Sequence, residues 1–133
     1  MTLLELCYYK RDVILEDSVK KLEKAQLEHY KLLTTEQIKR KMLNLFHMLV
    51  KSIEVNSSEE MMEYMDKVSD KRHEAGYELQ EVQSAVNMLE EIMWEKVSKF
   101  VDDDLQISAI KQVTRLLSKA KIELADEYSL LKS

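Results

Sequence analysis

The scarcity of turn-forming residues limits the folds open to this chain more than any other feature. Its 133 residues include no proline and one glycine, whereas average proteins have roughly 5% proline and 7% glycine. Sheet proteins use these residues at the tight turns that join their strands. Long helices joined by short connections need few of them. We therefore expect an all-α fold, and the length predicts a single domain over residues 1–133.

Apolar residues recur at helical spacing in five segments. Two S/T-x-x-E/Q capping boxes, Thr34–Gln37 and Ser57–Glu60, predict helix starts. Asp17 or Ser18 is a further candidate cap, so the first segment is either one bent helix or two. The segments lie at about 3–33, 34–54, 57–75, 78–101 and 105–131. We expect a five-helix globin-like or a four-helix-bundle-like domain.

The stretch Lys71–Val97 holds both the only glycine, Gly76, and the only tryptophan, Trp94. Glycine adopts positive φ without a Cβ clash and often follows a helix C-terminus, and Arg72 in the preceding turn suits the negative helix end. The sequence therefore predicts a helical corner at Gly76. Arg72, Gly76 and Trp94 are expected to determine the fold there.

Charge and apolar patterning restrict the partners of the chain. The net charge of −5 comes from 25 acidic and 20 basic residues, and these are interspersed, which argues against binding to nucleic acid. The apolar runs are too short to cross a membrane, and the N-terminus has no signal-peptide pattern. A lone cysteine, Cys7, is typical of a reducing compartment. We expect a cytoplasmic protein.

No motif indicates catalysis or metal binding. His29, His47 and His73 lie on separate segments and form no H-x-x-x-H pair, and Asp70–His73 is the closest approach to a di-iron motif. Haem would need one of the histidines as an axial ligand. His47 is the best placed for this role, but we expect instead that its ring is hydrogen-bonded to a carbonyl.

Paired carboxylates do not supply an active site either. Glu90 and Glu91 are adjacent on a helix, so they point about 100° apart and are assigned to a solvated face. There is no Gly-rich phosphate loop and no nucleophile elbow. We expect no enzymatic activity, no metal and no cofactor.

Eight methionines leave one alternative open. Met61, Met65 and Met93, with Phe100, are candidates to line an apolar pocket for a lipid-like molecule or haem, because methionine side chains are flexible and polarisable. The default expectation is that the same residues fill the core of the domain. The alternative function is therefore a small-molecule-binding helical sensor.

The last segment has an unusually narrow apolar seam. Its spacings of 3, 4, 3, 4, 4 and 3 residues approach those of a coiled coil. The seam packs either on the core of the same domain or on a second copy, which makes five of its residues a candidate dimer face: Ile110, Val113, Leu117, Leu124 and Tyr128.

One family resemblance accompanies these patterns. The basic helix end with Arg72, the following Gly76, and a helix with Val82, Ala85 and Trp94 resemble the N-terminal domain of the RsbRD type of RsbT co-antagonists. That family is related to the RsbR sensors of bacterial stress signalling, whose N-terminal domains are globin-like, lack haem and form dimers.

The resemblance implies a non-enzymatic sensory or regulatory module that acts by dimerisation and helix repacking. Such domains usually precede a STAS domain or a histidine kinase. The sequence ends at Ser133 without either, so we expect a STAS protein or a kinase as signalling partner.

Overall fold

The chain folds into helices joined by short turns. The computed structural model describes residues 1–132, and no strand occurs among them. Its elements are α1 (Leu3–Tyr9), α2 (Arg11–Lys24), the 3-10 turn η1 (Tyr30–Leu32), α3 (Thr35–Val55), α4 (Glu59–Glu74), α5 (Leu79–Phe100), the 3-10 turn η2 (Asp103–Leu105) and α6 (Gln106–Leu131). The predicted all-α fold is confirmed.

The N-terminal segment divides differently from the prediction. The break falls at Lys10, and Ser18 lies inside α2, where its hydroxyl donates to the Ile14 carbonyl at 2.7 Å instead of capping a helix. The helix also ends early, at Lys24, because Gln26 adopts φ +52° and turns the chain out of the helix. The first segment is thus two α-helices and a short 3-10 turn.

One predicted capping box forms and the other does not. Thr34 and Gln37 exchange both hydrogen bonds, at 2.9 and 3.1 Å. Ser57 instead accepts from the Glu59 amide at 3.3 Å, and the box is absent. The reason is Asn56, whose left-handed φ of +51° closes α3 and delays the start of α4 by one residue.

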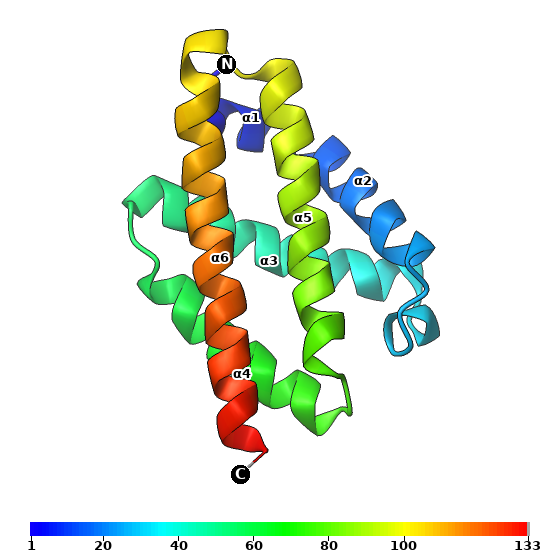
Figure 1. Cartoon of the computed structure of the whole chain (residues 1–133). Helices are drawn as coiled ribbons and strands as arrows, with labels where there is room; N and C mark the ends of the chain where they lie inside the picture. Colours follow the sequence, from blue (N-terminus) through cyan, green and yellow to red (C-terminus); the bar gives the residue numbers. More distant parts are fainter. Residues whose placement is uncertain (133) are drawn as a thin grey trace.

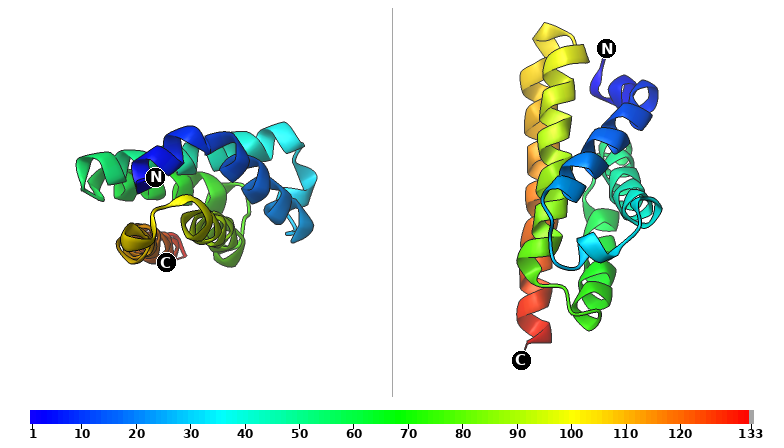
Figure 2. Two further views of the ribbon diagram at one scale, coloured as in Figure 1. Left: turned by 90° about the horizontal axis from the view of Figure 1, so that it is seen from above. Right: turned by 90° about the vertical axis from the view of Figure 1, so that its right-hand side faces the viewer.

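The helices form two layers. α5 and α6 pack antiparallel in one layer, and α1 to α4 make up the other (Figures 1 and 2). α3 crosses behind the α5–α6 pair, while α4 packs mainly on α6 and α2 packs on both α3 and α5 (Figure 1). The core lies between the layers, and its largest buried side chains include Phe46, Leu49, Met61, Leu89, Met93 and Tyr128.

No helix within residues 1–132 has the length and hydropathy needed to cross a bilayer. The lone thiol, Cys7 on α1, is buried in the core. Burial raises the pKa of Cys7 to about 12, so the group packs as a neutral, weakly reactive thiol.

Candidate functional site

The corner at Gly76 has the predicted geometry. Gly76 has φ +88°, its amide donates to the His73 carbonyl at 3.0 Å, and the Tyr77 amide donates to the Arg72 carbonyl at 2.9 Å. These bonds satisfy the last carbonyls of α4 and turn the chain into α5. A Cβ at residue 76 would also lie 3.4 Å from the His29 ring.

A buried carboxylate fixes the loop before η1 to this corner. Glu81, on the first turn of α5, accepts from the His29 amide at 2.8 Å and lies 2.7 Å from His29 Nδ1. Burial alone would raise the pKa of Glu81, but hydrogen bonds from the His29 and Glu78 amides outweigh it and lower the pKa. The His29 ring stacks on Tyr77 at 4.7 Å between centroids.

Arg72 lies among four of the six tyrosines. Its guanidinium carbon is 5.6 Å from the centre of the Tyr77 ring. Burial raises the pKa of Tyr30 to about 12 and also raises the pKa values of Tyr64, Tyr77 and Tyr128, and the positive charge of Arg72 offsets part of each shift. This one arginine on α4 therefore lies near side chains of η1, of the turn before α5 and of α6.

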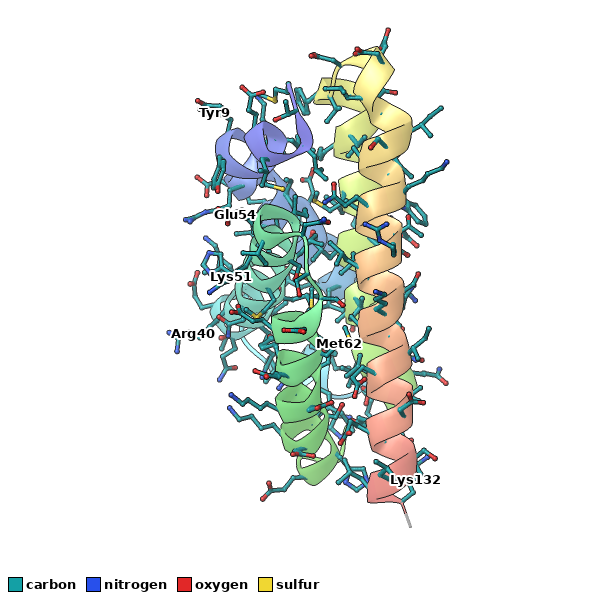
Figure 3. The ribbon with its side chains drawn as sticks, turned by 90° about the vertical axis from the view of Figure 1, so that its left-hand side faces the viewer. Tyr9, Arg40, Lys51, Glu54, Met62 and Lys132 are labelled. Atoms are coloured by element: carbon teal, nitrogen blue, oxygen red, sulfur yellow. The ribbon has the colours of Figure 1, made fainter. Side chains whose placement is uncertain are left out.

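A cleft of about 440 Å³ lies beside Arg72, between α3 and α4. We call it the basic cleft because five of its lining residues carry positive charge: Arg40, Lys41, Lys67, Lys71 and Arg72. Glu36 is the single carboxylate in its lining. Figure 3 shows α4 between α3 and α6, with Arg40 on the side away from α6.

The charges of the basic cleft act on one another. Burial, followed by the charges of Arg72 and Lys71, lowers the pKa of Lys41. None of the five cations forms an ion pair with a carboxylate of residues 1–132. The cleft is thus a site of unneutralised positive charge on a chain whose net charge is −5.

A small apolar cavity adjoins the basic cleft. Its volume is about 30 Å³, and Lys41, Tyr64, Val68 and Arg72 line both spaces. Arg72 Nε is buried here without a hydrogen-bond partner. A cavity of this size holds a water molecule or two, not a lipid tail or a haem.

The predicted methionine-lined pocket is not formed in this structure. Met61, Met65 and Met93 are buried in the core, and only Met65 reaches the small cavity. Phe100 is half-buried beneath Lys10, whose Nζ lies 4.5 Å from the ring centre. His47, considered for haem, is exposed on α3. These methionines fill the core because α4 and α5 point them into the space between the layers.

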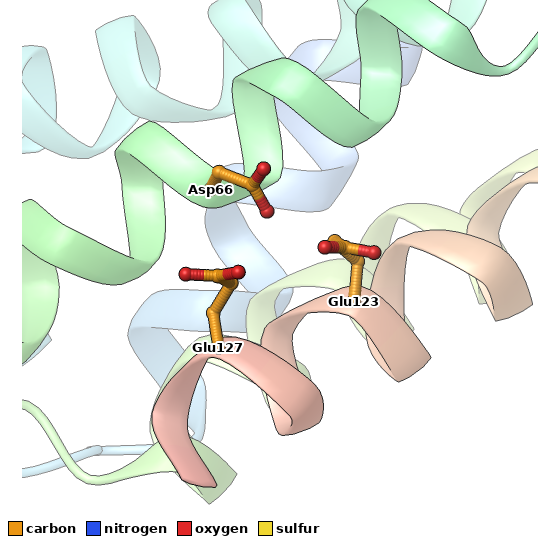
Figure 4. A group of neighbouring side chains, drawn as sticks. All are labelled: Asp66, Glu123 and Glu127. Carbon is orange, nitrogen blue, oxygen red and sulfur yellow. The ribbon is translucent and has the colours of Figure 1, made fainter. Parts of the chain in front are cut away.

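Three carboxylates meet on the opposite side of α4 (Figure 4). Asp66 of α4 points toward Glu123 and Glu127 of α6, and their nearest oxygens all lie within 4.8 Å of one another. We call them the acidic cluster. Contact with Asp66, then burial and the neighbouring negative charges, raise the pKa of Glu123, while burial and nearby carboxylates raise that of Glu127.

The candidate dimer face is buried inside the domain. Val113, Leu117 and Leu124 have no exposed surface, Tyr128 is 2% exposed and donates to the Tyr77 carbonyl, and Ile110 is half-buried. The seam therefore packs on its own core, the first of the two alternatives, because α4 and α5 cover it. It presents no open face to a second copy.

Trp94 lies apart from the corner. It is 37% exposed on α5, and its indole N–H donates to the Thr114 hydroxyl of α6 at 2.9 Å. It thus contributes to the α5–α6 contact, whereas Arg72 and Gly76 shape the corner.

No protein family, curated protein or solved structure matches the chain.

Proposed function

We propose that this chain is a non-enzymatic sensory or regulatory module that acts through association with other proteins. The observation that supports the proposal is the position of α4 between two groups of like charge. Its cations Lys67, Lys71 and Arg72 face Arg40 and Lys41 across the basic cleft. On its other side, the acidic cluster joins α4 to α6. Like charges disfavour the packing that brings them together.

A helix in this position suits a change between two packings. A ligand shifts such an equilibrium only by its different affinity for the two states. A bound anion at the cleft, or a proton or cation at the acidic cluster, would favour the packing described here. The charges favour α4 as the responsive element.

The family resemblance remains part of the proposal. A module like the N-terminal domain of the RsbT co-antagonists would work as a dimer in the bacterial cytoplasm and pass a stress signal to a STAS protein or a kinase. Its association would use a surface other than the seam of α6. Releasing that seam would expose Leu117 and Leu124, at about 1.5–3 kcal/mol for each side chain.

Exposed aromatic side chains on α1 offer such a surface. Tyr8 and Tyr9 are 58% and 74% exposed, and Tyr8 donates to Glu54 at 2.6 Å, next to the exposed Val55 at the end of α3. Tyrosine is enriched in protein interfaces because it combines an apolar ring with a hydrogen-bonding group.

The test follows α4 and the oligomeric state in the same samples. Hydrogen exchange of the backbone amides is compared in wild type and in Glu123→Gln/Glu127→Gln, and light scattering is recorded at micromolar concentrations. We expect a wild-type dimer, and about twofold or more slower exchange in α4 of the variant, because like-charge repulsion has been removed.

The matched control is Asp12→Asn/Glu16→Gln, which removes two exposed charges from α2. Its α4 should exchange as in wild type. A monomeric wild type whose α4 exchanges alike in all three proteins would contradict the proposed function.

A further inference from the structure

We propose that the basic cleft between α3 and α4 is a binding site for a small molecule that carries a phosphate or pyrophosphate group. The inference goes beyond the proposed function: it assigns a site and a ligand class, and it stands whether or not α4 changes its packing.

The pairing of partly buried cations singles out this cleft. Six Lys and Arg residues within positions 1–132 are at least partly buried. Three of them have carboxylate partners. Lys21 pairs with Glu91 at 2.6 Å, Lys96 with Asp17 at 2.7 Å and Lys121 with Glu90 at 3.1 Å. Desolvating a cation without a partner is costly.

The other three partly buried cations are Lys10, Lys41 and Arg72. Lys10 lies over the Phe100 ring, at the other end of α2 from the corner. Lys41 and Arg72 both line the basic cleft, and neither contacts a carboxylate. Two of the three partly buried cations that lack a carboxylate partner are thus in one place. An anion in the cleft would supply the missing partner.

The donors suit a tetrahedral oxyanion better than a simple halide. A guanidinium presents a planar fork of N–H groups that matches two phosphate oxygens at once. Arg72 lies at the junction of the cleft and the small cavity, and its buried Nε has no hydrogen-bond partner. Lys41, Lys67 and Lys71 add positive charge around the same space. Together they can neutralise the two or more charges of a phosphate group.

The dimensions and the remaining lining point to a small molecule. The volume of about 440 Å³ falls within the roughly 300–1,000 Å³ of typical ligand sites. Leu33, Tyr64 and Val68 provide apolar surface, and Asn44 provides an amide. A cleft that combines apolar surface with clustered cations fits a phosphorylated small molecule, whereas nucleic acid is bound along extended basic surfaces.

The experiment is calorimetric titration of the full chain with inorganic pyrophosphate at near-physiological salt. Wild type should bind one pyrophosphate per chain with saturation. Lys41→Gln and Lys71→Gln should each weaken binding about tenfold, because a charge-assisted contact contributes about 1.5 kcal/mol or more. Arg72→Lys keeps the charge but loses the planar fork, and should weaken binding by a similar factor.

The matched control is Lys39→Gln, which removes one exposed charge from α3 outside the cleft. Its affinity should stay within twofold of wild type, and circular dichroism verifies that each variant is folded. Absence of saturable binding to wild type would overturn the proposal. So would an equal loss in Lys39→Gln and Lys41→Gln, since it would show attraction to net charge alone.

A second titration uses a short single-stranded DNA of the same total charge. Binding of the DNA that is tighter than that of pyrophosphate, and equally sensitive to Lys39→Gln, would replace the small-molecule site with a nucleic-acid surface. Saturable pyrophosphate binding by a monomeric wild type, with α4 exchanging alike in wild type and in the two charge variants described above, would sink the proposed function but leave the site intact. The reverse pattern would sink the site alone.

Discussion

Arg72 shows how far a single residue can be understood from the sequence. Its position near the end of a helix follows from the basic residues before Gly76. Its surroundings do not, because Tyr30, Tyr77 and Tyr128 come from η1, from the turn that precedes α5 and from α6. Sequence patterns could not reveal the cleft for the same reason: Arg40 and Lys41 lie on one helix and Lys67 and Lys71 on another, and only the packing of α3 on α4 brings them together.

Gly76 offers a stability prediction at the residue scale. Gly76→Val should lower the free energy of unfolding by about 1 kcal/mol or more, because φ is +88° and valine is strained there. Urea unfolding measures the change. Ala75→Val is the control, since φ of Ala75 is −79° and its side chain is exposed. An unchanged midpoint for Gly76→Val would show that the corner has been misread.

Glu123 yields a prediction with a pH dependence. Its pKa in the folded chain is raised above the ordinary value of 4.5 by contact with Asp66 and by burial. Stabilisation from the protonated group is therefore complete below about pH 4.5 and is lost as the pH rises through the folded-state pKa. At pH 7 the ionised cluster should destabilise the contact between α4 and α6.

Glu123→Gln should accordingly raise the free energy of unfolding at pH 7, by about 0.2–0.5 kcal/mol for each like-charge pair that is removed. The gain over wild type should shrink between pH 7 and pH 4.5. Urea unfolding across this range measures it, with the exposed Glu16→Gln on α2 as the control. A gain that grows toward acid pH would refute this account of the cluster.

At the scale of elements, apolar spacing predicts the bounds of α5 but not which of its charged residues are buried. The helix was expected at about 78–101 and is found at Leu79–Phe100. Three charged residues on it are nevertheless 5% exposed: Glu81, Glu90 and Lys96. Glu90 had been assigned to a solvated face, but Lys121 of α6 pairs with it. A pattern within one helix cannot reveal a partner on another, so buried ion pairs escape it.

The seam of α6 provides the prediction for that element. Leu117 is fully buried, so Leu117→Ala should cost about 2–5 kcal/mol of unfolding free energy at every protein concentration. Ile122→Ala on the same helix, at a residue that is 61% exposed, should cost about 0.5 kcal/mol or less. Urea unfolding measures both. A loss for Leu117→Ala that depends on protein concentration would instead restore the seam as a dimer face.

At the scale of the whole molecule, the sequence predicted the helices but not how they pack. Caps and apolar spacing located α3, α5 and α6 to within a residue or two, because these signals are local. The crossing of α3 behind the α5–α6 pair, and the division of charge on the two sides of α4, depend on contacts between distant segments. Spacing alone could place neither.

The separation of Trp94 from the tyrosines gives the molecule two optical probes at different places. The single tryptophan reports on the contact between α5 and α6, through its indole bond to Thr114. Tyr30, Tyr64, Tyr77 and Tyr128 gather around Arg72. Near-ultraviolet absorption by tyrosine and fluorescence from tryptophan therefore follow the surroundings of Arg72 and the α5–α6 contact, respectively, without an added label. Loss of the tyrosine signal before the tryptophan signal on heating would place the first loosening at the corner.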